Sequence, residues 1–114
     1  MASDVSSQML KGILKGIMLM ILEKKPNYGY GISQEMNKYG LETIPKGTIY
    51  PLLATMERQG LIKSKLKISE KGPDRKYYYV TPEGTKSKSE FIDQWHILQN
   101  TVTKLIDEGQ NNEN

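Results

Sequence analysis

Apolar residues in the first third of the chain recur with the period of a helix. Residues 7–24 carry them on more than one side, and a serine at the start can cap the helix that they predict. A helix this apolar is expected to be buried against its own domain and against a partner chain. A second, short helix is predicted over residues 29–39, with Ile32 and Met36 facing inward and a glycine ending it.

A third helix is predicted after a loop over residues 41–44. Its apolar positions are three and four residues apart: Ile49, Leu52, Leu53 and Met56. Two starting points fit. If the helix begins at Pro45, Pro51 lies inside it and removes one backbone hydrogen bond. If Thr48 caps it, Pro51 falls in the first turn, where a missing N–H costs nothing. We adopt the earlier start, with a local distortion at Pro51.

Residues 61–69 change to the two-residue period of a half-buried strand. The inward positions are Ile62, Ser64, Leu66 and Ile68, and the outward positions are Lys63, Lys65 and Lys67. Residues 71–74 have turn chemistry, and residues 75–81 return as a second strand rich in tyrosine. The pattern therefore predicts an antiparallel hairpin with a cationic outer face.

The end of the chain predicts one long helix over residues 82–107, with Thr81 as its cap and Pro82 in its first position. An a/d stripe runs along this helix: Phe91, Trp95, Leu98, Val102 and Leu105. Only the first helix of the same chain is available to cover the stripe, so a second copy would complete its burial. The predicted dimer interface adds Leu10 and Ile13 to the stripe, and residues 108–114 are predicted to be disordered.

The composition of the 114-residue chain argues against several kinds of site. There is no cysteine, which excludes disulfides and thiolate metal sites. His96 is the single histidine, which argues against a histidine metal site and a catalytic triad. We therefore expect no metal, no cofactor and no enzymatic activity. The apolar content of 37% is modest and fits a core that a partner subunit helps to complete.

The charge of the chain is unevenly distributed, although its net value is only +3. Lysine and arginine outnumber acidic residues between positions 46 and 76, whereas residues from 107 onward are acidic and rich in amides. This distribution predicts a localised face for a polyanion. The apolar run at residues 17–22 is far shorter than the roughly 20 residues of a membrane span and lacks a signal-peptide cleavage site. We therefore expect a cytoplasmic protein without a membrane partner.

A helix followed at once by a basic hairpin is the layout of a winged helix-turn-helix, a module that binds double-stranded DNA. The predicted fold is α+β, with three helices and a two-stranded β-wing in residues 1–81 and a long C-terminal dimerisation helix in residues 82–107. The predicted DNA contacts come from the start of the third helix and from the hairpin tip: Lys46, Gly47, Thr48, Tyr50, Lys71, Gly72, Arg75 and Lys76. Tyr50 has an equally good alternative role as a packed aromatic at the base of the hairpin. An adaptor whose hairpin docks a partner protein is the alternative function.

Three separated segments carry a family resemblance: LKGILKGIMLMILEKKPNYGYGI, KGTIYPLLATMERQGLI and GPDRKYYYVTPEG. In this order they resemble the PadR family of bacterial transcriptional regulators, over about residues 10–84. The resemblance implies a dimeric winged-helix repressor that binds a palindromic operator and is released by small molecules or stress signals. It also implies that Tyr28 and Tyr30 face DNA, together with the third-helix and wing residues given above.

The single C-terminal helix is similar to that of the shorter PadR members, and Trp95 matches the tryptophan of the multidrug-responsive members. The resemblance implies a flat aromatic slot between two copies for a planar aromatic effector. By position its lining would be Met9, Gly12, Lys15, Gly16, Leu19, Ile92, Trp95 and Gln99. The ligands of those members are often cationic. This chain departs from that pattern, because Lys15 places a positive charge near the slot and Gln99 offers no negative charge. A sealed dimer core around Trp95 is the alternative.

Overall fold

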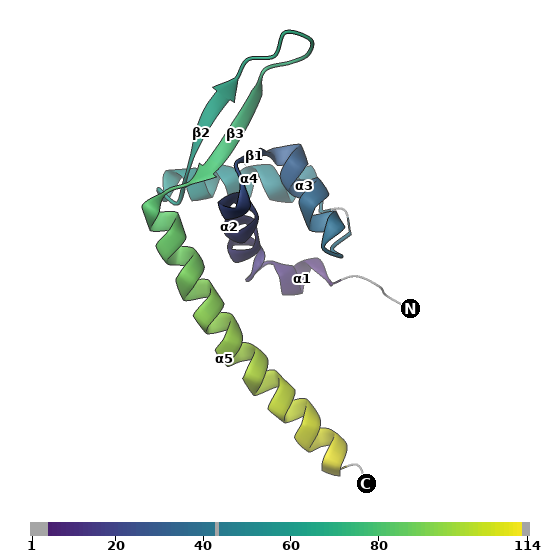
Figure 1. Ribbon diagram of the computed structural model, residues 1–114. Helices are drawn as coiled ribbons and strands as arrows, with labels where there is room; N and C mark the ends of the chain where they lie inside the picture. The colour runs from purple at the N-terminus through teal and green to yellow at the C-terminus, as the bar shows by residue number, and fades with distance from the viewer. Residues whose placement is uncertain (1–4, 43, 113–114) are drawn as a thin grey trace.

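The computed structural model of the chain describes residues 5–42 and 44–112, and it has the predicted α+β winged-helix fold. Its helices are α1 (Ser7–Leu10), α2 (Leu14–Lys24), α3 (Gly29–Lys38), α4 (Lys46–Arg58) and α5 (Pro82–Asn112). Its strands are β1 (Asn27–Tyr28), β2 (Ile62–Lys67) and β3 (Arg75–Val80). Figure 1 shows the hairpin of β2 and β3 projecting from the helical body, while α5 leaves the body in a different direction.

The predicted first helix is divided into α1 and α2, which corrects the single helix expected over residues 7–24. The chain turns at residues 11–13, where the N–H of Ile13 bonds to the carbonyl of Leu10 at 2.9 Å. Gly12 lies in this turn, and glycine lowers helix propensity by about 1 kcal/mol relative to alanine. Leu10 and Leu14 are buried on either side of the turn, so the break lets both segments pack on the core.

Helix α4 has the earlier of its two possible starts, because Pro45 is its N-cap and Pro51 lies inside it. The N–H groups of Thr48 and Ile49 bond to the carbonyl of Pro45 at 2.9 and 3.2 Å. The helix runs unbroken through Pro51, and the hydroxyl of Thr55 donates to the Pro51 carbonyl at 3.0 Å. Pro51 has no N–H to donate to the carbonyl of Gly47, one turn back. Gly47 is exposed to solvent.

The sheet has a strand that the sequence pattern did not predict. Its order is β1-β3-β2, with both neighbouring pairs antiparallel. Two registers matter below: Tyr28 lies opposite Tyr77, and Lys67 lies opposite Arg75. The half-buried face predicted for residues 61–69 is also shorter than expected. Leu66 is 65% exposed and Ile68 is 79% exposed, because the hairpin extends beyond the helices that cover its base (Figure 1).

The core is arranged around α2, which packs against α3, β3 and α5. Met18 and Leu19 are completely buried, as are Ile32 of α3 and Leu53 of α4. Within the described residues, no helix has the length and apolarity that crossing a membrane would require.

Thr81 fixes the beginning of α5, as the cap prediction required. Its hydroxyl accepts from the N–H of Gly84 at 3.1 Å and donates to the carbonyl of Gly60 at 2.6 Å. Gly84 lies so close to the carbonyl of Leu61 that a β-carbon there would overlap it. Helix α5 is therefore tied at its start to the end of α4.

The predicted disorder after residue 107 is wrong for residues 108–112, which continue α5, while residues 113 and 114 lie outside the described chain. Extending a formed helix fixes one residue for each new hydrogen bond. This gain offsets the weak helix propensities of Gly109 and the asparagines.

Candidate nucleic-acid interface

The N-terminal half of α4 presents the predicted DNA-contacting residues to solvent. Lys46, Gly47, Thr48 and Tyr50 are exposed, whereas Ile49 is buried. The N–H groups at the first two helical positions have no intrahelical acceptor, and the helix dipole adds partial positive charge there. This end of α4 is therefore suited to an anion such as a phosphate.

Tyr50 packs against the start of α3 rather than at the base of the hairpin, and part of its side chain remains exposed. Its ring lies against Gly29, where an added β-carbon would overlap the ring atoms, and yet the side chain is 44% exposed. Gly29 begins α3, and the adjacent Tyr28 and Tyr30 rings lie 6.3 Å apart between centroids. The tyrosines predicted to face DNA thus adjoin the exposed start of α4.

The hairpin presents its cations on two different faces. Arg75 lies over the ring of Tyr28, 4.6 Å from its centroid. Lys76 points to the opposite face, where its Nζ lies 3.4 Å from Glu57 Oε1. Lys71 and Gly72 are exposed in the tip, which the N–H of Ser69 helps to close by donating to Asp74 at 3.2 Å.

Glu57 joins α4 to the base of the hairpin. The hydroxyl of Ser64 donates to Glu57 Oε2 at 2.6 Å. This hydrogen bond and the nearby Lys76 hold the pKa of Glu57 below its usual value, with Ser64 as the larger cause. The wing and the helix are therefore held together by a bond to the charged form of Glu57, a link that sequence periodicity did not indicate.

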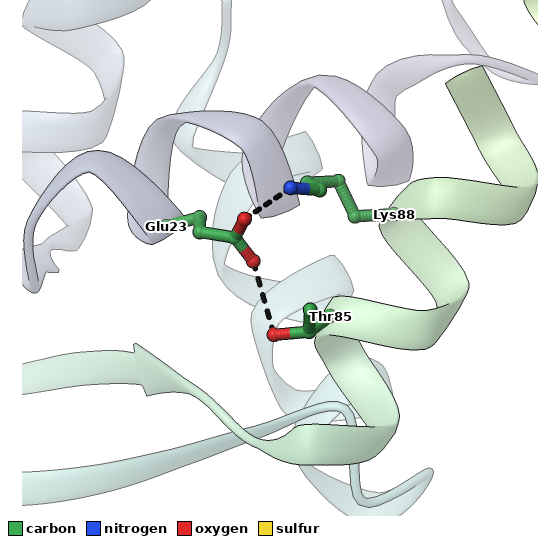
Figure 2. A network of polar contacts seen from close by, with 3 residues as sticks. All are labelled: Glu23, Thr85 and Lys88. Atoms are coloured by element: carbon green, nitrogen blue, oxygen red, sulfur yellow. Dashed lines mark hydrogen bonds and ion pairs between the residues drawn. The ribbon is translucent and has the colours of Figure 1, made fainter.

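A second polar network joins α2 to the first turns of α5 (Figure 2). Glu23 accepts hydrogen bonds from the Lys88 ammonium and from the Thr85 hydroxyl, the latter at 3.0 Å. Both bonds lower the pKa of Glu23, that of Lys88 more strongly. One turn further along α5, Phe91 lies against Gly16 of α2, where a β-carbon would overlap its ring. These contacts fix the direction in which α5 leaves the body.

An apolar groove of about 490 Å³ opens beside this junction. It lies between α2, the end of α3 and α5, and its lining is Ile17, Met20, Ile21, Met36, Tyr39, Leu41 and Ile92, with Glu23, Lys24 and Lys88 alongside. Lys24 donates to the hydroxyl of Tyr39, which raises the pKa of Lys24. The groove was not predicted from the sequence.

The residues predicted to line an effector slot are divided by the structure. Gly12, Lys15, Trp95 and Gln99 are exposed, and so is Met9, at 72%. Leu19 is completely buried in the core and Gly16 is covered by Phe91, so neither offers surface to a ligand in this conformation. Ile92 is half-buried and lines the apolar groove instead.

The residues predicted for a dimer interface are divided in a similar way. Leu10 is buried in the core of its own chain, and Ile13 and Phe91 are half-buried. The rest of the a/d stripe on α5 is exposed: Trp95 at 39%, Leu98 at 52%, Val102 at 47% and Leu105 at 63%. This row of apolar side chains has no cover within the described chain.

Comparisons with known proteins give one consistent family. The sequence model of the transcriptional regulator PadR-like family matches residues 18–90. A PadR-like transcriptional regulator from Bacillus cereus is 43% identical, with a TM-score of 0.79 over 88% of this chain and 97% of its own. A PadR family regulator from Eggerthella lenta is 34% identical, with a TM-score of 0.78 over 87% of this chain and 86% of its own. Transcriptional regulator Rv3488 of Mycobacterium tuberculosis is 33% identical over 55% of this chain and 57% of its own.

The bond from Ser64 to Glu57 predicts a pH-dependent contribution to stability. Because folding lowers the pKa of Glu57, the bond stabilises the folded chain at pH values above the pKa of Glu57 in the unfolded chain. This contribution is lost as the pH falls through the pKa of Glu57 in the folded chain. Ser64→Ala should lower the free energy of unfolding by about 1 kcal/mol near pH 7, and by much less near pH 3.

Urea unfolding at both pH values and one protein concentration measures this difference. Ser64→Thr, which keeps the hydroxyl, is the control and should resemble the wild type. A loss of the same size at both pH values would contradict the role of the charged carboxylate.

Proposed function

The chain belongs to the PadR-like family of transcriptional regulators, and from this we propose that it is a ligand-responsive repressor that binds a palindromic operator as a homodimer. Membership of this family implies DNA binding and places the chain among regulators rather than enzymes. The proposed site of action is DNA in the cytoplasm. The following observations support the DNA-binding face, the dimer and the effector.

One observation carries the DNA-binding part of the proposal. The exposed start of α4, the tyrosines at the start of α3 and the hairpin with Arg75 adjoin one another through Gly29–Tyr50 and Tyr28–Arg75. A helix N-terminus beside cations and hydroxyl groups matches the way in which winged helices hold a major groove and its flanking phosphates. We propose Lys46, Gly47, Thr48 and Tyr50 as the groove contacts, and Lys71, Gly72 and Arg75 as the wing contacts.

The exposed stripe of α5 supports a homodimer. Trp95, Leu98, Val102 and Leu105 form one apolar row on a helix of which only the first turns are covered. The apolar groove beside α2 is a second surface that would gain by burial, and the two together give a second copy an apolar seat on each protomer. A two-fold dimer would set the two α4 helices at one helical repeat of DNA, about 34 Å, which matches a palindromic operator.

The effector is proposed to act on the junction between α2 and α5. Trp95 lies one turn beyond Phe91, the residue that packs on Gly16. A planar aromatic molecule stacked on Trp95, near Lys15 and Gln99, would press on the crossing of these helices. Because the Glu23 network and Phe91 fix the direction of α5, a small change there would alter the spacing of the two DNA-binding lobes.

The operator can be found by sequencing the DNA fragments that the protein retains from its own genome. Lys46→Ala and Arg75→Ala should each weaken binding of the dimer to the retained fragment about thirtyfold at about 0.15 M salt, and should reduce the salt slope by about 1.8, because each protomer loses one contact. Each substitution removes one cation per protomer from the proposed DNA contacts.

Gel-shift titrations over a range of salt concentrations measure both effects. Lys104→Ala, on the exposed surface of α5, is the charge-matched control and should change neither. Wild-type affinity in both test variants would rule out this DNA face. Failure to retain any duplex would favour a protein-docking wing.

The exposed apolar stripe of α5 predicts that a charged side chain introduced on it would dissociate the dimer. Val102→Glu should raise the dimer dissociation constant at least about a hundredfold, because the interface would bury a carboxylate without a partner. Asn100→Glu adds the same charge at an exposed position off the stripe and should leave the dimer intact. Sedimentation at several concentrations distinguishes the two variants, and a dimeric Val102→Glu variant would place the interface elsewhere.

Trp95 is the single tryptophan, so its fluorescence reports directly on the proposed slot. Planar aromatic dyes should quench it in a saturable manner. Lys15→Gln should strengthen binding of a cationic planar dye about threefold and leave a neutral one unchanged, because it removes a like charge near the slot. The absence of quenching by either dye would indicate a sealed interface.

A further inference from the structure

The outer face of the sheet combines cations with tyrosine rings. Residues that lie opposite each other in neighbouring antiparallel strands point to the same side. By the observed register this face therefore carries Lys63, Lys65 and Lys67 of β2, Arg75, Tyr77 and Tyr79 of β3, and Tyr28 of β1. Among the described strand residues, it carries no acidic side chain.

Two of these cations lie over tyrosines of the next strand. The Lys67 Nζ lies 5.0 Å from the ring centroid of Tyr77, and the Arg75 guanidinium lies 4.6 Å from that of Tyr28. Both contacts run diagonally across the sheet in the direction of β1. The two rings are themselves neighbours, with centroids 5.3 Å apart, so the two cation–ring pairs lie side by side.

This arrangement has an electrostatic cost in the isolated chain. Lys67 and Arg75 lie directly opposite each other, and like charges in that position repel. On the other face of the hairpin the charge is compensated, since Lys76 pairs with Glu57. Lys67 and Arg75 have only ring faces as partners in the described chain, and a ring attracts a cation without neutralising it.

We propose that Lys67 and Arg75 form a preorganised two-cation site for the backbone phosphates of duplex DNA, with Tyr77 and Tyr28 as the positioning residues. This inference rests on the proposed DNA-binding function and adds Lys67, Tyr77 and the ring of Tyr28 to it. The rings restrict the rotamers of two long side chains before binding, so that less entropy is lost when a phosphate is bound.

The position of the site identifies DNA as the polyanion. Tyr28 lies at one end of the row. Its ring is next to that of Tyr30, which is 53% exposed, and it precedes Gly29, against which Tyr50 of α4 packs. The two-cation site is therefore continuous with the exposed N-terminal half of α4. A duplex in contact with α4 would pass its backbone along this row.

The test uses fluorescence anisotropy with a labelled duplex that the wild-type protein retains from its genome. Lys67→Ala should weaken binding of the dimer about thirtyfold at about 0.15 M salt and lower the salt slope by about 1.8, because each protomer loses one contact. Tyr28→Leu should weaken binding about threefold with the slope unchanged, because the cation is kept but not positioned. Tyr28→Phe keeps the ring and should bind as the wild type does.

Two further variants separate positioning from a general structural role. Lys104→Ala removes the same charge from the exposed surface of α5, away from the wing, and should leave the salt slope unchanged. Tyr28→Leu should add nothing to Arg75→Ala, because its effect passes through Arg75. Far-ultraviolet circular dichroism verifies that each variant is folded.

The outcomes distinguish this inference from the function on which it rests. A wild-type protein that binds no duplex would end both. Duplex binding with wild-type affinity in Lys67→Ala would overturn the two-cation site alone. A loss in Tyr28→Phe equal to that in Tyr28→Leu would assign the effect to a hydroxyl contact and overturn the positioning role of the ring.

Discussion

The burial of α2 is the constraint on which the rest of the structure depends. Met18 and Leu19 are fully buried and Leu22 is nearly so, on a helix that meets α3, β3 and α5. A helix that is apolar on several sides cannot lie on the surface, so other elements must enclose it. The elements proposed to face DNA are therefore positioned by contacts on their buried sides, which do not involve their exposed residues.

The same constraint explains why α5 can act as a lever. Its direction is set within its first turns by Thr81, by the Glu23 network and by Phe91 on Gly16. About 20 residues follow, which at 1.5 Å each amount to roughly 30 Å of helix. A tilt of about 5° at the junction would therefore move the far end by roughly 3 Å. The proposed effector would need to shift α2 against α5 only slightly to change the spacing of the two DNA-binding lobes of the proposed dimer.

Residue spacing along the sequence predicted much of the fold. It did not predict the contacts that depend on strand register or on where the helical body ends. The helical period predicted α3, α4 and the stripe of α5, whereas the break at Gly12 was missed because apolar residues continue at helical spacing on both sides of it. Strand β1 has only two residues, too few to show a period, and it exists through its pairing with β3. Alternation shows which side of a strand faces inward, but not that the body ends before Leu66.

The candidate site shows the same division. Lys46 and Tyr50 were predicted as DNA contacts from their place on a recognition-type helix, and the structure shows that both are exposed. Leu19 could not be separated from a slot lining, because an apolar side chain on a helix fits a core and a pocket equally well. The contact of Arg75 with Tyr28 joins residues far apart in the chain, and only the register of three strands brings them together.

The two faces of the wing explain how a chain with a net charge of only +3 can present a strongly positive surface. On the inner face, Glu57 balances Lys76 and holds the hairpin to α4. On the outer face, the cations are held by rings that leave their charge available. The last turns of α5, with Asp107 and Glu108, carry negative charge at the far end of the molecule. This separation of charge gives the chain a dipole that would orient it with the wing toward a polyanion, whereas the net charge alone would give little attraction at physiological salt.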